Sequence, residues 1–190
     1  MKGLVVSFRG QYNHLIKRSL WRIGIEVLIV DHNVVGRTLR TFKPDLIVLG
    51  GGPYTLPKDY KLLEKVVSMV LDVDVPTLGI CLAHQLIALY LGGIIGKSRT
   101  PEYGMVNINI VNDDPLFNNI PKTFRAWCSH NDEVKKLPKT LKVIAKSDTC
   151  PIEGFKLKNK PIYGLQFHPE VEHTEYGLQI FENLKMIARS

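Results

Sequence analysis

The sequence predicts an α/β fold in which an open, mainly parallel sheet is flanked by helices on both faces. Two observations carry this prediction. In the first half of the chain, short apolar runs typical of buried strands alternate with helix-like segments. From Met105 onward, short alternating runs separated by turns indicate antiparallel strands that extend or cap the sheet. With 190 residues, 45% of them hydrophobic, the chain is expected to form a single domain over residues 1–190.

The first half of the chain supplies the parallel part of the expected sheet. Its strands are short apolar runs, and the segments between them have a helix-compatible composition. The expected strands are Leu4–Phe8, Glu26–Asp31, Asp45–Leu49 and Thr77–Ile80, and the expected helices are Gln11–Ile23, Tyr60–Leu71 and Gln85–Leu91.

The second half is expected to add antiparallel strands and to end in a helix. The segment from Tyr176 to Ala188 places Leu178, Phe181 and Leu184 near one helical face, so this helix should pack back on the sheet. The expected strands are Met105–Val111, Phe124–Trp127, Leu141–Ser147, Ile152–Lys156 and Ile162–Phe167.

Cys81 lies where a buried strand turns into a helix. Small residues two positions away on either side, Gly79 and Ala83, allow a tight turn like the one that carries serine nucleophiles in hydrolases. At the start of a helix, unpaired N–H groups and the helix dipole favour the reactive thiolate. We therefore expect Cys81 to be a nucleophile, with the N–H of Leu82 directed at the oxyanion that would form.

His168 and Glu170 are the expected base and its orienting carboxylate. They follow the strand-like run that ends at Phe167, so they lie in a loop at a strand end, where catalytic groups of α/β sheets gather. Pro169 prevents a helix there. His168 can take the proton of the Cys81 thiol and later give it to a leaving amine, while ionised Glu170 fixes the tautomer of the ring. The three residues form a predicted Cys-His-Glu triad.

The glycine run Gly50–Gly52 ends another buried strand and should lie beside the cysteine turn. Its backbone is free to approach a ligand, and the alternative is a flexible strand-to-helix loop. A phosphate-binding loop is not expected, because no Lys and Ser or Thr follow at the required spacing. The segment Gly92–Ser98 ends in Gly-Lys-Ser but follows a helix, so we expect a helix end and a turn there.

Metal binding is not predicted. His168, Glu170, Glu172 and His173 are close in sequence, but a proline interrupts the segment and the spacing of a helical zinc site is absent. The histidines expected to be solvated or structural are His14, His32 and His84.

Composition and charge exclude several classes of function. The formal charge is +7, but the lysines alternate with apolar strand residues and no nucleic-acid motif accompanies them, so we expect a solvated basic face or a docking surface for an acidic partner. No apolar stretch could span a bilayer and no signal pattern is present, so a cytoplasmic protein without nucleic-acid or membrane partners is expected. Its cysteines, Cys81, Cys128 and Cys150, fit a reducing compartment with one working thiol.

With these residues the chain resembles the class-I, triad-type glutamine amidotransferases, whose G-x-C-x-G-x-Q turn and H-P-E triplet hydrolyse glutamine. The resemblance runs nearly end to end. Three further segments are similar to the glutaminase part of GMP synthase: Glu102–Gly104, Ser129–Asp132 and Gln166–Thr174. The resemblance implies a flavodoxin-like fold and the hydrolysis of L-glutamine to glutamate and ammonia through a thioester on Cys81.

One position departs from the family pattern, because Ala83 stands where the motif usually has glycine. In the first turn of a helix alanine adopts its conformation at no cost, and only its methyl group must be accommodated. A positive φ at this position would instead misplace the oxyanion N–H. We expect the helical conformation and an active enzyme.

The resemblance assigns site residues beyond the triad. It implies that the N–H of Gly52 joins that of Leu82 in the oxyanion hole. The implied substrate contacts are Gly51, Gln85 and the backbone around Ser129 and His130. The residues implied to face a partner protein are Asp132, Glu172 and His173.

Because the chain ends at Ser190, the resemblance implies a free glutaminase subunit that works with a separate ATP pyrophosphatase (synthetase) subunit. That partner would hold ATP and magnesium, adenylate xanthosine monophosphate (XMP) and use the ammonia to form GMP, while this chain needs no cofactor. One alternative is an amidotransferase subunit of another pathway, such as anthranilate synthesis, against which the Ser129–Asp132 segment and His173 argue. Others are a non-catalytic regulatory subunit and a stand-alone cysteine peptidase or γ-glutamyl hydrolase.

Overall fold

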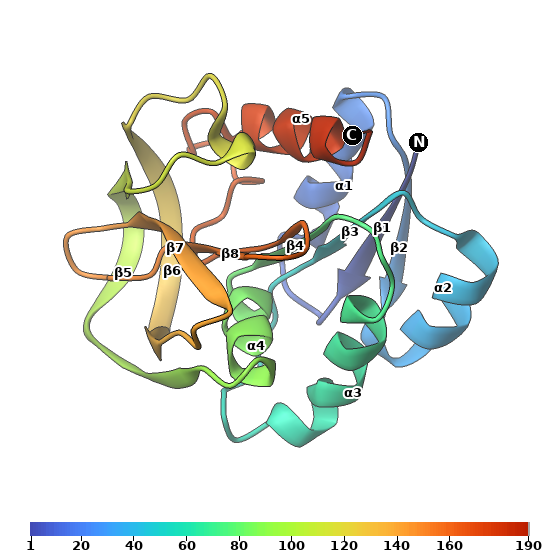
Figure 1. Cartoon of the computed structure of the whole chain (residues 1–190), viewed down its shortest axis with the longest axis horizontal. Helices are drawn as coiled ribbons and strands as arrows, with labels where there is room; N and C mark the ends of the chain where they lie inside the picture. The colour runs from blue at the N-terminus through green and yellow to red at the C-terminus, as the bar shows by residue number, and fades with distance from the viewer. Residues whose placement is uncertain (190) are drawn as a thin grey trace.

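A computed structural model describes residues 1–189, in which nine strands form one sheet and five α-helices cover it (Figure 1). The strands are β1 Lys2–Ser7, β2 Glu26–Asp31, β3 Leu46–Leu49, β4 Thr77–Ile80, β5 Ile94–Ile110, β6 Thr123–Lys136, β7 Leu141–Lys146, β8 Gly154–Leu157 and β9 Ile162–Leu165. The helices are α1 Asn13–Arg22, α2 Val35–Phe42, α3 Tyr60–Leu71, α4 Leu82–Tyr90 and α5 Gly177–Ile187, with short 3-10 turns at His32–Val34 and Pro115–Phe117.

The sheet has the order β2-β1-β3-β4-β9-β8-β7-β5-β6. Its first five strands are all parallel, and their order is that of flavodoxin-like sheets, so the predicted fold class is confirmed. Such sheets bind ligands outside the carboxyl ends of their parallel strands. The loops after β1, β3, β4 and β9 therefore meet at one edge of the sheet, and the predicted triad residues lie in two of these loops.

Each face of the parallel half has its own apolar core. Helices α1 and α5 cover one face, and α2, α3 and α4 cover the other (Figure 1). Along β1, Leu4 and Val6 belong to the core under α2, α3 and α4, whereas Val5 belongs to the core under α1 and α5. This alternation follows from the strand, in which successive side chains point to opposite faces. Burial on both faces fixes the strand ends that carry the site.

The antiparallel half contains a long ribbon that the sequence predicted only in part. Strand β5 pairs with β6 along most of its length, with an irregularity between Lys97 and Glu102. The expected turn over Gly92–Ser98 is correct only at its start: Gly92 follows α4 with φ +96°, and β5 then begins at Ile94. The expectation was wrong beyond that point because the pairing with β6, itself longer than expected, is a long-range contact that local pattern does not reveal.

Two helices differ from the expected ones. Helix α2 was not predicted; it has eight residues, and its packing on α3 is close, since a Cβ at Gly36 would lie 2.6 Å from Sδ of Met69. Helix α4 begins at Leu82 instead of Gln85, which places Ala83 inside the helix. No helix within residues 1–189 combines the length and the apolar character that crossing a membrane requires.

Candidate active site

Four loops at the carboxyl ends of parallel strands surround a cavity of about 330 Å³. Cys81 and His168 line it from the ends of β4 and β9, and Ser129 of β6 closes one side. The other lining residues, from the loops after β1 and β3, are Arg9, Gly10, Gln11, Tyr12, Gly51, Gly52 and Pro53. A larger cavity of about 890 Å³ beside α5 contains none of the triad residues. The predicted nucleophile, base and glycine loop therefore meet in the smaller cavity.

The backbone of Cys81 has a conformation that non-glycine residues rarely adopt, with φ 53° and ψ −105°. Its N–H donates to the carbonyl of Leu165 at 2.8 Å, and its carbonyl accepts from the N–H of Gln85 at 3.2 Å. The turn is tight because Gly79 has no side chain: a Cβ there would lie 2.9 Å from the backbone of Ala83. The backbone strain of this turn is therefore carried by the nucleophile, and the sheet and helix on either side hold it in place.

Ala83 adopts the expected helical conformation. It is fully buried within α4 and is not among the residues of the range 1–189 that have a positive φ. Its methyl group joins the apolar core on the α4 side of the sheet. The alanine therefore replaces the usual glycine without disturbing the turn that precedes it.

The thiol of Cys81 contacts two polar groups. It donates to the carbonyl oxygen of Ser129, 3.9 Å from Sγ, and Nε2 of Gln166 donates to the sulfur from 3.7 Å. Gln166 is fully buried, and the sequence analysis gave it no role of its own. Its position two residues before His168, at the end of β9, is the signal that could have identified it, since both side chains lie at the same strand end.

His168 and Glu170 form a buried hydrogen-bonded pair. Nδ1 of His168 lies 2.8 Å from Oε1 of Glu170, and the two residues are 5% and 3% exposed. Because the carboxylate accepts this bond, Nδ1 carries the proton, and Nε2 is the nitrogen left to exchange a proton with a substrate. Burial lowers the pKa of His168, but Glu170 and Cys81 act in the opposite direction and together raise it well above its ordinary value. The pair has the geometry of an oriented base.

The loop that carries this pair is anchored to β6. The N–H of His168 donates to the carbonyl of Trp127 at 2.9 Å. The hydroxyl of Thr174 donates to the carbonyl of His168 and accepts from the N–H of Trp127, at 2.7 and 2.9 Å. Arg125 adds two side-chain hydrogen bonds to Glu175, at 2.9 and 3.0 Å. These bonds fix the base relative to the strand that contains Ser129.

Gly52 and Leu82 keep the free N–H groups that an oxyanion hole requires. Within the described residues no acceptor takes either N–H. Both glycines of the loop are needed for its close approach: a Cβ at Gly52 would lie 2.2 Å from the carbonyl oxygen of Phe8, and one at Gly51 would lie 3.8 Å from Cβ of Cys81. The oxyanion roles of Gly52 and Leu82 stay predictions that this geometry supports.

The residues implied to bind substrate occupy two kinds of position. Gly51 and Ser129 line the cavity. Gln85 lies just behind it, where its Nε2 donates to the carbonyl of Asp132 at 2.7 Å and to Oε1 of Gln166 at 2.9 Å. Substrate contact by these residues stays a prediction, and the structure adds that Gln85 connects β6 to the residue that touches the thiol.

His130 is the fourth residue implied to bind substrate, and its side chain points away from the cavity. It follows Ser129 in an extended strand, so the two side chains point to opposite faces. Among residues 1–189 its ring forms a group of possible metal ligands with three other buried side chains, within 4.8 Å of one another. These are Glu102, Cys150 and Glu153. Of the segment considered for metal binding from the sequence, Glu172 and His173 are exposed instead.

The residues implied to face a partner lie at the rim of the site. Glu172 and His173 are exposed on the loop that follows the triad, and the ring of His173 packs on Trp127 with 5.4 Å between centroids. Asp132 is half-buried in β6. Their role in partner binding stays a prediction.

The loop after β1 is a part of the site that the sequence analysis missed. Gly10 is pressed against the glycine loop, since a Cβ there would lie 2.3 Å from the carbonyl oxygen of Gly51. Tyr12 places its ring edge-on to His168. Arg9 is held with φ 66° and pairs with Asp31 at 3.3 Å. The segment has no motif, and the only signal for it was that it follows the carboxyl end of a parallel strand.

Comparison with known proteins agrees with this geometry. The family model described as glutamine amidotransferase class-I matches residues 4–187. The chain is 47% identical over 183 residues to the glutamine-hydrolyzing subunit of GMP synthase from Ignicoccus hospitalis, covering 96% of both chains. It is 42% identical over 184 residues to the protein of the same name from Pyrococcus furiosus, covering 97% of both. A crystal structure from Thermoplasma acidophilum, of a protein provisionally assigned as a GMP synthase subunit, superposes with a TM-score of 0.92 at 36% identity, covering 100% of this chain and 94% of that one.

Proposed function

The chain belongs to the class-I glutamine amidotransferase family, and on that premise we propose that it is the glutaminase subunit of a two-subunit GMP synthase. It hydrolyses L-glutamine to glutamate and ammonia and delivers the ammonia to a synthetase subunit. One observation carries the proposal: a strained Cys81 faces a cavity beside the buried His168–Glu170 pair, in a chain similar over nearly its whole length to relatives named as glutamine-hydrolyzing subunits of GMP synthase.

The reaction proceeds in two halves. The Cys81 sulfur attacks the side-chain amide carbon of glutamine while His168 holds the thiol proton, and His168 then passes that proton to the departing ammonia. This leaves a γ-glutamyl thioester on Cys81. In the second half His168 takes a proton from water, which attacks the thioester, and glutamate and the free thiol are released. Glu170 keeps the ring of His168 oriented and stabilises its positive charge throughout.

The groups around the thiol serve the charge that develops on the amide oxygen. The N–H groups of Gly52 and Leu82 bind this oxyanion, and the start of α4 adds the positive end of the helix dipole. Gly51, Gln85 and the backbone at Ser129 hold the rest of the glutamine. Removing one oxyanion donor from an enzyme of this kind costs roughly 10²- to 10³-fold in kcat, so the close approach of the glycine loop matters for rate.

The proposed partner is an ATP pyrophosphatase subunit that holds ATP and magnesium and converts XMP to GMP. Its expected contacts include Glu172 and His173, which are exposed beside the triad, and Asp132 at the end of β6. The reaction belongs in the cytoplasm, where a catalytic thiol stays reduced. The helical conformation of Ala83 argues against a non-catalytic regulatory subunit, because the turn that positions Leu82 is intact.

Ammonia release from glutamine tests the proposal. It is measured for the purified chain alone and then with an ATP pyrophosphatase subunit, ATP, magnesium and XMP. Cys81→Ala is expected to abolish release, whereas Cys128→Ala, the same change at a buried cysteine outside the cavity, is expected to retain it. Cys81-dependent hydrolysis that the mixture stimulates, with GMP formed, supports the assignment. Hydrolysis indifferent to the mixture would indicate another partner or a free-standing hydrolase, and silence in both conditions would indicate a non-catalytic subunit.

A further inference from the structure

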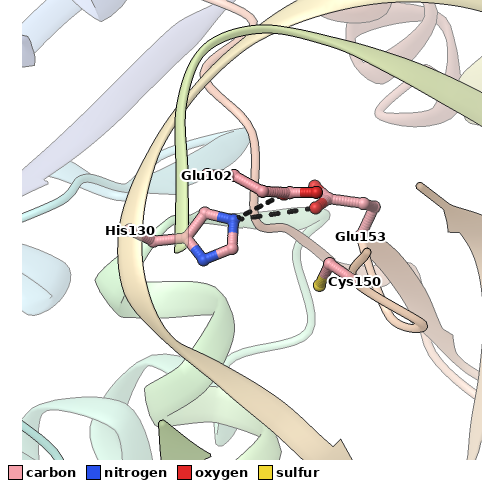
Figure 2. Close-up of side chains that lie close together, drawn as sticks. All are labelled: Glu102, His130, Cys150 and Glu153. Atoms are coloured by element: carbon pink, nitrogen blue, oxygen red, sulfur yellow. Dashed lines mark hydrogen bonds and ion pairs between the residues drawn. The ribbon is translucent and has the colours of Figure 1, made fainter. Parts of the chain in front are cut away.

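On the other face of β6, four buried side chains form a cluster that the proposed reaction does not use. Figure 2 shows the ring of His130 directed at Glu102 and Glu153, with Cys150 beside them. Nε2 of His130 lies 2.9 Å from Oε2 of Glu102 and 3.7 Å from Oε1 of Glu153. None of the four residues is more than 5% exposed. Burying three ionisable groups of this kind is costly unless their charges and protons are matched.

The hydrogen bonds of His130 require a proton on both ring nitrogens. Nδ1 lies 3.1 Å from the backbone carbonyl oxygen of Asp132, which can only accept. Nε2 faces the carboxylate of Glu102, which accepts the second bond. A ring that donates from both nitrogens is an imidazolium. Burial lowers the pKa of His130, but its bonds to Glu102 and Glu153 prevail and raise it to about 10.

Glu102 is the ionised partner of this imidazolium. Besides His130, the hydroxyl of Ser147 donates to its Oε1 at 2.5 Å, and the hydroxyl of Thr149 donates to the same oxygen. Burial raises the pKa of Glu102, but these donors and the proton of Glu153 outweigh it and lower the pKa to about 2. A carboxylate that collects so many donors is stabilised in its charged form.

Glu153 has the opposite surroundings. It is fully buried, and neither of its carboxyl oxygens meets the hydrogen-bond criteria with any group in the described residues. A charged carboxylate in that position would lack both water and donors, whereas a protonated one can share its proton with the neighbouring Glu102. Burial is also the main reason that the pKa of Glu153 is raised, to about 7.

The other ionisable groups that face the cluster are neutral. Burial raises the pKa of the thiols of Cys128, on β6, and Cys150, on the loop after β7, far above the ordinary range. Burial and the charge of His130 lower the pKa of His84, on α4, to about 3. Glu133, also on β6, is paired with Lys135. With a positive His130, a negative Glu102 and a protonated Glu153, the buried cluster carries no net charge.

The cluster is tied to the nucleophile by two routes. In the first, the carbonyl of Asp132 accepts from both His130 and Gln85, and Gln85 donates to Gln166, whose amide touches the Cys81 sulfur. In the second, the backbone carbonyl of Glu153 accepts from the N–H of Gln166 at 2.8 Å. Both routes end on Gln166, and β6 itself carries Ser129 to the thiol from the opposite face.

We propose that His130, Glu102 and Glu153 are positioning residues: a buried imidazolium, its carboxylate and a protonated carboxylic acid that together lock β6 and Gln166 against Cys81. The 2.9 Å contact between His130 and Glu102 is the length of a charge-assisted hydrogen bond. Two ligands of one tetrahedral zinc ion, each at roughly 2.0–2.1 Å, would lie about 3.3 Å apart. The geometry therefore points to a shared proton in this cluster and not to a metal ion.

The protonation state can be read directly by nitrogen-15 NMR of the histidine rings of the full chain at pH 8. The His130 signals are identified by their loss in His130→Gln, and a histidine in a short peptide, neutral at that pH, is the reference. Both ring nitrogens of His130 are expected to carry protons in the unmodified chain and in Glu153→Gln, and only one in Glu102→Gln. A neutral ring in the unmodified chain, or a metal-bound Nε2 accompanied by stoichiometric zinc, would overturn the proposal.

The positioning role is tested by glutaminase kinetics with the synthetase partner present, and this part of the test rests on the proposed function. Glu102→Gln is expected to lower kcat at least tenfold. Glu153→Gln, which keeps a donor, is expected to retain at least a third of kcat, and Glu153→Met, of similar length without a donor, is expected to lose most of it. Equal losses in the Gln and Met variants would contradict a protonated Glu153. If the unmodified chain releases no ammonia, the proposed function fails, while the NMR result still decides the state of His130.

Discussion

The ring of Tyr12 lies edge-on against the ring of His168, with 5.0 Å between centroids and 78° between planes. Tyr12 therefore limits the rotation of the catalytic ring on the side away from Glu170. We expect Tyr12→Leu to lower kcat for glutamine hydrolysis several-fold, because an aliphatic side chain leaves that side of His168 unsupported. Tyr12→Phe, which keeps the ring, should retain at least half of kcat. Equal losses in both variants, measured with the partner present, would show that the hydroxyl matters and the ring does not.

A methyl group at Gly10 should disable the site without touching any catalytic side chain. The Cβ of Gly10→Ala would lie 2.3 Å from the carbonyl oxygen of Gly51, so the glycine loop must move away from Cys81. We expect kcat to fall by tenfold or more, because the oxyanion donor moves with the loop. Gly96→Ala is the matched control: its Cβ meets only the flexible side chain of Lys135, at 3.3 Å, and should cost little. Similar rates for the two variants would contradict the role of loop contact.

Ala83→Gly should change stability and leave the rate alone. Glycine within a helix costs about 1 kcal/mol relative to alanine, and the lost buried methyl group adds roughly 0.8 kcal/mol. The free energy of unfolding in urea should therefore fall by about 1–2 kcal/mol, with the glutaminase rate within twofold of the original. A rate that rose by much more than tenfold would mean that the alanine strains the turn at Cys81.

The stability of the fold should depend on pH through Glu153. Its pKa is about 7 in the folded chain, against an ordinary value of 4.5. As pH rises from 4.5, the unfolded chain loses this proton and the folded chain keeps it, so stability falls by up to about 1.4 kcal/mol per pH unit until the folded group ionises. Glu153→Gln should remove this slope.

Unfolding by urea between pH 4.5 and 6.5 is the clean measurement. In that window Glu102, with a folded pKa of about 2, is ionised in the folded chain, and the stabilisation from His130 is lost only above its ordinary value of 6.5, as pH rises toward 10. Parallel curves for the original chain and Glu153→Gln would mean that Glu153 is ionised in both states.

The parts of the molecule that could be predicted are those written in local pattern. A buried run followed by small residues around Cys81 predicted both a parallel strand and the nucleophile turn, and a run ending before His168 predicted the second. The pairing of β5 with β6 could not be read in this way, because register is a long-range contact. For that reason Glu102, directly opposite His130 in the ribbon, was not recognised as its partner. Tyr12 was missed because its role depends only on where β1 ends.

The distance along the chain between Cys81 and His168 has a consequence for folding. Strand β4 ends at the nucleophile and pairs with β9, which begins more than eighty residues later at Ile162, so this pairing has a high contact order. A nascent chain that has not yet emerged as far as β9 has the cysteine without its base, without Gln166 and without the strand that enforces the strained turn. The thiol therefore gains its reactivity only when synthesis is almost complete, and labelling by a glutamine-like electrophile would report the fully folded chain and not its precursors.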